Sequence, residues 1–432
     1  MFTVRRVLAQ PGPATCAPRR LGPFSSNLVS APAAKWSIVE YRGRAGLLEL
    51  EADWRRLSAA MPLRTSFHAF EANLAYLDCV MPEPDRFKCL ALSDGTHVRA
   101  ICPLEPNTDR TLGLPIPVWK VPQHPHCRLG DIICPEDEAR RELIPALVGH
   151  LRRSSRGPQL LFLGPLEEDS LVWDGLRYLD CRDFCVDLAK PVHVLDCTQP
   201  FEVLMSGLSR NFRGNLRKAR KKLEALADVR FVTATPGADF GAEFEAFLSV
   251  EASGWKGARG TRTALRFRDR HADFFLSLSS MLGRDDRCEI NALYVGGSCV
   301  ASQFCTRTGA DYSILKIGYD ENHARVSPGQ LLIARTLRTC CEDPDIERLN
   351  LVSDADWHVK WRADSIAMRQ VHIAISRWSG RPLIALLRLR LGYARRLVRW
   401  LRCARDRLVA RGNADRKAIS RAGRQGHNGT RT

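Results

Sequence analysis

Apolar and polar positions follow their clearest pattern in the second half of the chain. Between Cys288 and Tyr319 the two classes alternate, with Gly296-Gly297 as one of the interruptions. Alternation with a period of two indicates half-buried strands, and glycine pairs between them indicate hairpin turns. Apolar residues then recur at helical spacing from Leu331, and Ile346-Glu-Arg-Leu-Asn-Leu-Val352 indicates a further short strand. The pattern predicts a hairpin, a further strand, a helix, another strand and a short helix.

The first half mixes the same two patterns. Leucines and aromatic residues recur at helical spacing from Ala45 to Leu57 and from Phe67 to Val80, whereas residues 87–105 alternate as two strands. A helix is predicted at 143–151, and strands at 159–163 and 192–195. At 432 residues the chain is too long for one ordinary core, so two domains of a mixed α/β (α+β) class are expected.

The predicted helix after residue 327 has an unusual start. Ser327 suits the N-cap and Pro328 the first helical position, and Gln330 completes a Ser-x-x-Gln capping box. Gly329 places no side chain over the free N–H groups of the first turn. Such a helix start, fed by a strand, can bind an anion such as a pyrophosphate. The alternative interpretation is an ordinary capped helix.

A basic helix is predicted near residues 209–227. Its polar face carries seven cations, and Phe212, Leu216 and Leu223 belong to its packing face. One interpretation is a solvated face. The other is that Arg213, Arg217 or Arg220 lines a cleft and attracts an anionic substrate. The cations are Arg210, Arg213, Arg217, Lys218, Arg220, Lys221 and Lys222.

Two further segments carry candidate chemistry. Trp255-Lys256 precedes a stretch rich in Gly and Arg (257–262), which indicates a loop able to order over a substrate. A core position for Trp255 is the alternative. Lys360 follows Asp356 by four residues, so a helix-stabilising ion pair is one interpretation. The other is a fixed cation that stabilises developing negative charge at a reaction centre.

Most of the net charge belongs to the C-terminal segment. Residues 380–432 hold fifteen Arg or Lys against two Asp, which is +13 of the net +17. A nucleic-acid-binding domain would carry its basic face on a folded core instead. Leu387, Leu391 and Val398 lie on one helical stripe with arginines on another, which predicts an amphipathic helix at 383–409 on an anionic membrane surface. A helix docked on the protein is the alternative. Residues 411–432 are expected to be disordered.

The remaining composition indicates a soluble globular protein. Hydrophobic residues make up 45% of the chain and charged residues 26%, and no run of eighteen apolar residues occurs. Residues 1–35 lack the apolar core of a signal peptide and are expected to form a disordered leader. The fifteen cysteines show no CxxC pair, so free thiols in a reducing cytoplasm and no metal site are expected.

The order and spacing of five segments resemble the acyl-CoA-binding half of the GNAT acetyltransferase fold. More narrowly, the chain looks like the acetyltransferases of bacterial cellulose and exopolysaccharide biosynthesis (the CelD/BcsL group), which are related to the FemAB transferases. The resemblance covers about 155 residues. The segments are Leu208–Glu224, Trp255-Lys256, Tyr319-Asp320, Ser327–Leu332 and Lys360-Trp361.

This resemblance implies two GNAT-like lobes, at residues 36–200 and 201–380, followed by the basic helix (381–410) and the tail (411–432). It implies transfer of an acetyl or other acyl group from CoA to a hydroxyl or amine of a sugar or polysaccharide-related acceptor. The implied location is the cytoplasm, with a peripheral position on the inner membrane. The implied catalytic residues are Lys360, Asp354 and Trp255; the donor-binding residues are Arg325, Val326, Ser327, Gly329, Gln330, Leu331 and Ile317; the acceptor-binding residues are Arg217, Tyr319 and Lys256.

Two other functions fit the same sequence. One is aminoacyl transfer from charged tRNA, as in the FemAB group, which would require a broad basic surface on the folded lobe. The other is a non-catalytic scaffold at the membrane, which the basic tail favours. Binding of acetyl-CoA would distinguish these functions, because the scaffold would not bind it and the tRNA-dependent enzyme would not need it.

Overall fold

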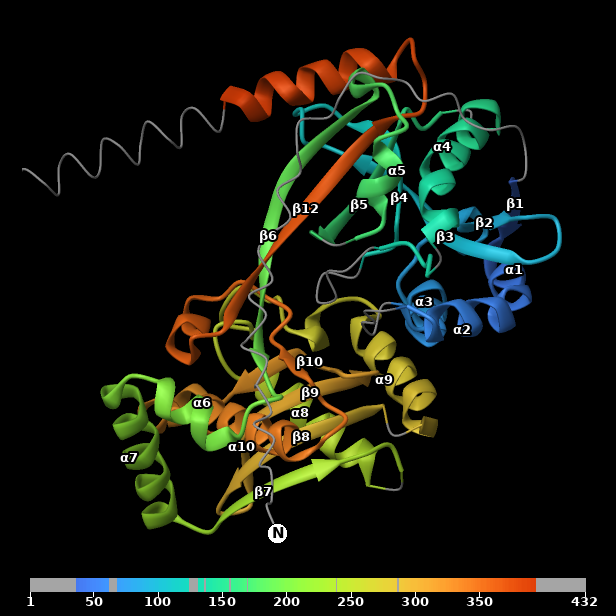
Figure 1. The fold of residues 1–432 in the computed structure, drawn as a ribbon. Coiled ribbons are helices and arrows are strands. Elements are labelled where there is room, and N and C mark those ends of the chain that lie inside the picture. The colour runs from blue at the N-terminus through green and yellow to red at the C-terminus, as the bar shows by residue number, and fades with distance from the viewer. Residues whose placement is uncertain are drawn as a thin grey trace, which may run out of the picture.

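The computed structural model describes residues 36–393 apart from 62–67, 124–130, 136, 155–156, 169, 238 and 286. The predicted leader (1–35) and the segment 394–432 lie outside the described residues. Within the described ranges, no helix is long and apolar enough to cross a lipid bilayer. The chain forms two stacked lobes joined by two long strands (Figure 1).

The upper lobe in Figure 1 is built mainly from the first half of the chain. Its strands are β1 (Ser37–Arg42), β2 (Lys88–Ser93), β3 (Val98–Asp109), β4 (Ile116–Lys120), β5 (Leu160–Glu167) and β6 (Phe184–Asp196). Its helices are α1 (Gly43–Glu49), α2 (Glu51–Ala59), α3 (Phe70–Cys79), α4 (Asp137–Ser154) and α5 (Val172–Leu176), with short 3-10 turns η2 (Pro84–Arg86) and η3 (Cys181–Asp183).

The lower lobe repeats this arrangement with the second half. Its strands are β7 (Val229–Ala234), β8 (Cys288–Val295), β9 (Ser298–Thr308), β10 (Asp311–Tyr319), β11 (Arg348–Asn350) and β12 (Asp364–Ala374). Its helices are α6 (Phe201–Gly207), α7 (Arg210–Leu226), α8 (Phe240–Glu251), α9 (His271–Leu282) and α10 (Pro328–Glu342). The 3-10 turns are η4 (Leu265–Phe267), η5 (Gly283–Asp285), η6 (Glu321–Val326) and η7 (Asp356–Trp361).

The two lobes exchange their last strands. The sheet order is β1-β2-β3-β4-β5-β12-β6-β11-β10-β9-β8-β7, so β12 pairs with β5 of the upper lobe and β6 pairs with β11 of the lower lobe. The strand order divides into two equivalent halves on either side of the β12–β6 pair. Each half contains one parallel strand pair, which is β4 with β5 in the upper lobe and β10 with β11 in the lower lobe. The long β6 and β12 strands run side by side between the lobes (Figure 1). The exchange makes the halves one continuous sheet.

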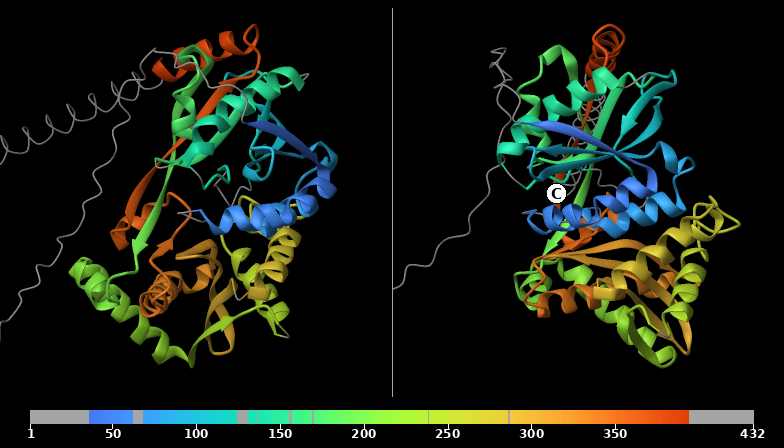
Figure 2. Two further views of the ribbon diagram at one scale, coloured as in Figure 1. Left: turned by 45° about the vertical axis from the view of Figure 1, so that its right-hand side comes forward. Right: turned by 90° about the vertical axis from the view of Figure 1, so that its right-hand side faces the viewer.

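A shared apolar core also joins the lobes. Phe247 and Phe275 both pack against Phe304, with ring centroids 6.0 and 4.9 Å apart. The same cluster contains Trp54 and Leu77 from the helices of the upper lobe. Figure 2 shows these helices lying between the two halves of the sheet. Because burial of apolar surface is the main favourable term in folding, the lobes stabilise each other.

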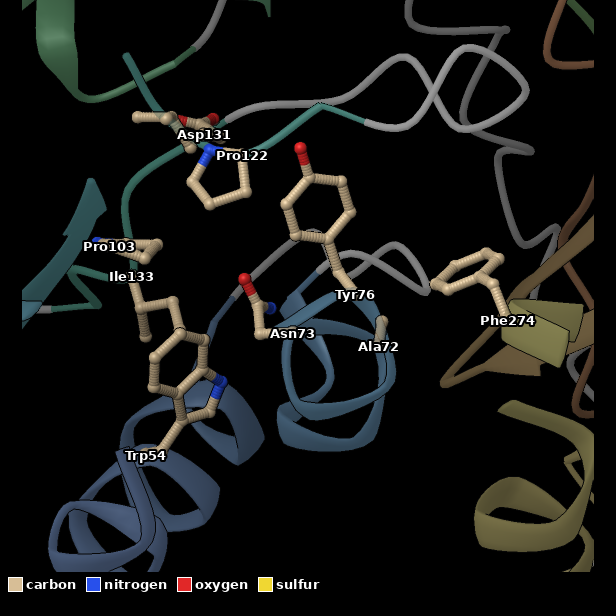
Figure 3. A pocket seen from close by; sticks show the side chains of 10 residues that line it. Trp54, Ala72, Asn73, Tyr76, Pro103, Pro122, Asp131, Ile133 and Phe274 are labelled. Atoms are coloured by element: carbon tan, nitrogen blue, oxygen red, sulfur yellow. The ribbon is translucent and has the colours of Figure 1, made fainter. Parts of the chain in front are cut away.

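A small cavity marks the same junction (Figure 3). Trp54, Asn73 and Tyr76 line it from the upper lobe, and Phe274 lines it from α9. Its volume is about 20 Å³, which is room for about one water molecule and not for a substrate. Tyr76 donates a hydrogen bond of 2.7 Å to Glu105, so this polar group is satisfied inside the junction.

The predicted fold class is confirmed, and so are the strands between 288 and 319 and the basic helix. Ser209 caps α7 by accepting a hydrogen bond from the N–H of Phe212 at 3.2 Å. The last predicted helix of the lower lobe is instead the 3-10 turn η7. Twelve cysteines in the described ranges are free thiols.

The prediction of a membrane-facing stripe through Leu387 and Leu391 requires correction. Residues 380–393 form a helix, but Leu387 is 1% exposed and packs with Ile384 against the sheet of the upper lobe. Arg381 pairs with Asp180 at 3.2 Å and also with Asp183. This part of the segment 383–409 is therefore docked, and residues 394–409 lie outside the described residues.

Candidate functional site

The parallel strands β10 and β11 diverge soon after they meet. They pair only from Asp311 to Ser313, and β10 then continues to Tyr319 with no strand of the described part of the chain on that side. At the end of β11, Val352 has φ of +56°, a conformation that is rare for a β-branched residue. This turn carries the chain away from β10. A cleft of about 280 Å³ lies between residues 314–317 and residues 351–353.

A second cleft of about 480 Å³ continues from the strand edge to the start of α10. Both clefts share Trp255, Lys256, Ile317 and Trp357, so together they form one groove. A strand edge offers backbone hydrogen-bonding groups to an extended ligand. The groove therefore leads from an open strand edge to a helix N-terminus.

The start of α10 differs from the predicted capping box. Ser327 has φ of +46° and makes no side-chain cap hydrogen bond. The side chain of Gln330 accepts a hydrogen bond of 2.7 Å from the indole N–H of Trp361, so it does not reach back to Ser327. The capping-box prediction is wrong because the tertiary contact with Trp361 takes the glutamine.

No steric reason within the protein requires a glycine at position 329. A Cβ added there would lie 3.7 Å from Tyr319 and 3.9 Å from Ile317, which are ordinary contacts, and the φ of Gly329 is not in the left-handed region. Gly329 nevertheless lines the larger cleft. The space that its missing side chain leaves open thus faces the groove, at the positive end of the α10 dipole.

A charged cluster that the sequence analysis missed lies under the groove. Glu251, at the end of α8, is almost fully buried and lies 3.4 Å from Lys256 and 3.3 Å from Lys316. Its second oxygen accepts the N–H of Leu265 at 2.8 Å. Glu251 lies four residues after Phe247 and three after Leu248, and therefore on the apolar face of its helix. An acidic residue on an apolar helix face is the sequence signal that could have identified this cluster.

The absence of a side chain at Gly318 lets α8 pack closely against β10. A Cβ added to Gly318 would lie 2.6 Å from the backbone of Glu251. A lone glycine inside a strand often marks such a close approach, and here it lets Glu251 reach the groove. Lys256 in turn donates to the carbonyl of Ile317 at 3.2 Å, so this lysine is committed to Glu251 and to β10.

Lys360 differs from the other two lysines of the groove. It is exposed on η7 and lines the larger cleft. Among the described residues, no ion pair joins Lys360 to Asp356 or to another acid. Side chains four positions apart do not face each other in a 3-10 turn, where the repeat is three residues. The helix-stabilising alternative for Lys360 therefore fails, and its charge remains available to a ligand.

The other predicted site residues divide into three groups. Trp255, Tyr319, Ser327 and Gln330 line the groove together with Ile317. In contrast, Val326 and Leu331 belong to the core of the lower lobe, and their contribution is packing. The remaining predicted residues are exposed and line neither cleft; they are Arg217, Arg325 and Asp354.

The basic helix α7 touches the site through its apolar side. The ring of Phe212 lies 5.2 Å from that of Trp361, at nearly a right angle. Through Trp361 and Gln330 it is connected to the start of α10. The cations Arg217, Lys218, Lys221 and Lys222 point outward into solvent. The structure thus favours the solvated interpretation for these four.

A buried histidine supports the turn that carries Lys360. His358 is buried in η7, its ring centroid lies 5.0 Å from that of His193, and its Nδ1 accepts the N–H of Ala355 at 3.4 Å. Burial and the neighbouring His193 lower the pKa of His358 to about 4, although Asp354 opposes the shift. Burial likewise lowers the pKa of His68 to about 4.

Stability is expected to decline as the pH falls from about 6.5 to about 4. The unfolded chain takes up protons at a histidine pKa of about 6.5, before the folded protein does, so acid favours unfolding in this window. Each of the two histidines can contribute up to about 1.4 kcal/mol per pH unit. Thermal midpoints at pH 7.5, 6.5, 5.5 and 4.5 test this, with His358→Asn expected to flatten the profile. An unchanged slope in that variant would contradict the assignment to His358.

Comparison with known proteins agrees with this geometry. Residues 210–361 match the family model described as acetyltransferase (GNAT) domain. No curated protein matches the chain in sequence. The crystal structure of FemX is 11% identical, with a TM-score of 0.52 over 78% of this chain and 98% of that chain. At this identity the likeness concerns the fold.

Two other solved structures are similar at lower scores. A tandem GNAT protein from the clavulanic acid biosynthesis pathway is 14% identical, with a TM-score of 0.46 over 79% of this chain and 99% of that one. L-PGS from Bacillus licheniformis is 13% identical, with a TM-score of 0.45 over 79% and 96%. The family match itself covers the diverging strands, the start of α10 and η7. Residues 210–361 are therefore similar to a GNAT acetyltransferase domain, and this stretch contains the groove.

Proposed function

We propose that the lower lobe transfers an acyl group from acyl-CoA to a hydroxyl or amine of a sugar or polysaccharide-related acceptor. The observation that supports this most is the groove that joins an open strand edge to an uncapped helix start. Those two features match the two halves of an acyl-CoA. Pantetheine is extended and rich in amides, and pyrophosphate is a double anion.

Each part of the donor has a partner in this proposal. The edge of β10 beyond Ser313 pairs with the pantetheine amides, as a strand would. The first turn of α10 receives the pyrophosphate through the N–H of Gly329 and the helix dipole, because Pro328 has no N–H and the N–H groups of Gln330 and Leu331 donate to the carbonyl of Ser327 at 3.0 and 3.3 Å. The thioester then lies where the two clefts meet, near Trp255, Lys256 and Ile317.

The reaction is proposed to be a direct attack of the acceptor hydroxyl or amine on the thioester carbonyl. The new ester or amide bond forms as the C–S bond breaks, and CoA leaves as its thiol with the proton that the acceptor loses. Negative charge develops on the thioester oxygen, and a fixed cation there lowers the barrier. Lys360 supplies that cation, because Lys256 and Lys316 already share Glu251. Among the described residues that line the two clefts there is no cysteine, which fits transfer without a thioester-linked enzyme intermediate.

The acceptor is proposed to enter through the smaller cleft. Its lining combines two lysines, Thr263 and Ser353 with the rings of Trp255 and Trp357. Hydroxyl-rich ligands suit such a mixture, because hydrogen-bonding groups fix their orientation while rings pack against their C–H faces. A sugar acceptor fits the resemblance to the cellulose and exopolysaccharide acetyltransferases. A cytoplasmic location is proposed with it.

A specific observation supports a second candidate, aminoacyl transfer from tRNA. The outward cations of α7 lie on the folded lobe, as that function would need. Arg220 is paired with Glu224 at 2.8 Å, but Arg217, Lys218, Lys221 and Lys222 are exposed on the same helix and form a basic surface there. Such a surface attracts a phosphate backbone.

Calorimetry with acyl-CoAs tests the proposal. Acetyl-CoA, or a longer acyl-CoA from a small panel, is expected to bind with one site per chain. Desulfo-CoA and 3′-dephospho-CoA serve as controls that separate recognition of the thiol from recognition of the phosphates. Absence of binding by every acyl-CoA, together with binding of tRNA lost at high salt, would favour the second candidate.

A further inference from the structure

The helix at residues 380–393 has two apolar faces. One face, with Ile384 and Leu387, is buried against the upper lobe. Successive helical residues are 100° apart, so Leu386, Leu389 and Tyr393 fall together with Pro382 within an arc of about 60°, nearly opposite the docked face. The exposed fractions are 52% for Leu386, 66% for Leu389 and 78% for Tyr393.

Charged side chains are scarce on this exposed face. Of the two exposed arginines, Arg388 donates to the carbonyls of Cys181 and Phe184 and so helps to dock the helix. Arg390 lies at the edge of the apolar arc. Trp378, in the turn just before the helix, is 93% exposed. Single exposed apolar residues are common, but three that share one helix face, with a further exposed aromatic residue in the turn before the helix, mark an interaction surface.

We propose that this row binds an anionic lipid surface. The row, called here the apolar ridge, consists of Trp378, Leu386, Leu389 and Tyr393. Tryptophan and tyrosine favour the boundary between lipid and water, where one end of the ring is apolar and the other is wet. The chain after the ridge, residues 394–432, holds twelve Arg or Lys against two Asp. Its charge complements anionic headgroups.

The docked face fixes how the protein would lie on the lipid. Ile384 and Leu387 hold the helix against the sheet while Arg381 is paired with Asp180 and Asp183. The helix runs along the outer end of the upper lobe, away from the lobe that carries the groove (Figure 2). The ridge can therefore contact lipid without covering the groove, and this inference does not depend on the proposed acyl transfer.

Vesicle sedimentation with the full chain tests the proposal. The protein is expected to sediment with vesicles of phosphatidylglycerol and phosphatidylcholine at low salt and much less with phosphatidylcholine alone. The triple variant Leu386→Ser, Leu389→Ser, Tyr393→Ser retains every arginine. It is expected to bind at least tenfold more weakly, which corresponds to about 1.4 kcal/mol. The matched control Leu188→Ser, Val203→Ser, Leu276→Ser removes apolar side chains that are 63%, 51% and 47% exposed elsewhere, and should bind as the parent does.

Three outcomes would overturn the proposal. Equal vesicle binding by the triple variant would assign all binding to the basic tail. A parent that is a dimer in sedimentation velocity, becomes a monomer on ridge substitution and ignores vesicles would assign the ridge to a second copy. An equal loss of vesicle binding in the control variant would show that exposed apolar residues anywhere on the protein contribute to binding, and not the apolar ridge in particular.

A second readout remains valid even if the triple variant folds poorly. Brominated anionic lipid quenches a tryptophan that enters the interface, so the fluorescence of the parent is expected to fall on binding. In a Trp400→Phe background, which removes the tryptophan of the basic segment, the exposed substitution Trp378→Phe should lose most of that quenching. Unchanged quenching in this variant would also contradict the proposal.

Discussion

Replacement of Gly329 by valine is expected to weaken acyl-CoA binding at least tenfold, or about 1.4 kcal/mol, without unfolding the protein. A pyrophosphate oxygen must approach a backbone N–H to about 2.9 Å, and a branched side chain at the first turn of α10 would occupy that space. An added Cβ meets Tyr319 and Ile317 only at ordinary contact distances, and the thermal midpoint shows whether the two γ-carbons of valine also fit at this buried position. Calorimetry and thermal midpoints measure the two effects separately.

A matched control exists in α8. Gly241 is the second residue of its helix, as Gly329 is of α10, and an added Cβ would meet nothing within 4 Å. Gly241→Val should leave both affinity and stability nearly unchanged, and Gly329→Ala should give an intermediate loss of affinity. Normal acyl-CoA affinity in a folded Gly329→Val protein would show that the pyrophosphate does not bind at this helix start.

Lys360→Ala is expected to lower the single-turnover rate about 100-fold while changing donor affinity less than twofold. A cation that acts on the thioester oxygen contributes mainly when charge develops in the transition state, and loss of one such group typically costs about 3 kcal/mol of barrier. Stability should be unaffected, because Lys360 is exposed and forms no ion pair with the described residues. Rapid-quench measurement of acyl transfer at saturating donor gives the rate.

Asp356→Ala is the control for this turn. Asp356 is exposed on η7 as Lys360 is, so its removal should leave rate, affinity and thermal midpoint unchanged. Partial recovery of rate in Lys360→Arg would indicate that charge is the property that matters. A normal rate in Lys360→Ala would move the stabilising role to Lys256 or Lys316.

Local pattern was sufficient to predict much of the lower lobe. Alternation between 288 and 319 predicted β8, β9 and β10, because a strand buried on one face repeats its apolar residues with a period of two. The spacing of Phe212, Leu216 and Leu223 predicted α7, and Ser327-Pro-Gly predicted where α10 begins. Trp255, Lys256, Ile317, Tyr319, Gly329 and Lys360 were predicted as site residues, and all six line the groove.

The sequence could not determine which of two possible partners a side chain or a helix face contacts in the folded protein. Gln330 could cap its own helix or bond Trp361, and only packing of η7 against α10 selected the second. Helical spacing identified an apolar stripe through Leu387 but not whether protein or lipid would cover it, and the sheet of the upper lobe covers it. Glu251 became part of the site only because Gly318 lets α8 approach β10.

The exchange of β6 and β12 is the largest of these choices. Each strand carries a pattern that would suit a place in its own lobe, and nothing local distinguishes that place from the equivalent one in the other lobe. The sequence by itself determined the strands between 288 and 319, the basic helix α7, the start of α10 and the basic C-terminal segment. Tertiary structure alone decided the strand exchange, the lysine left uncommitted and the face of the last helix that stays exposed, because each depends on contacts between segments far apart in the chain.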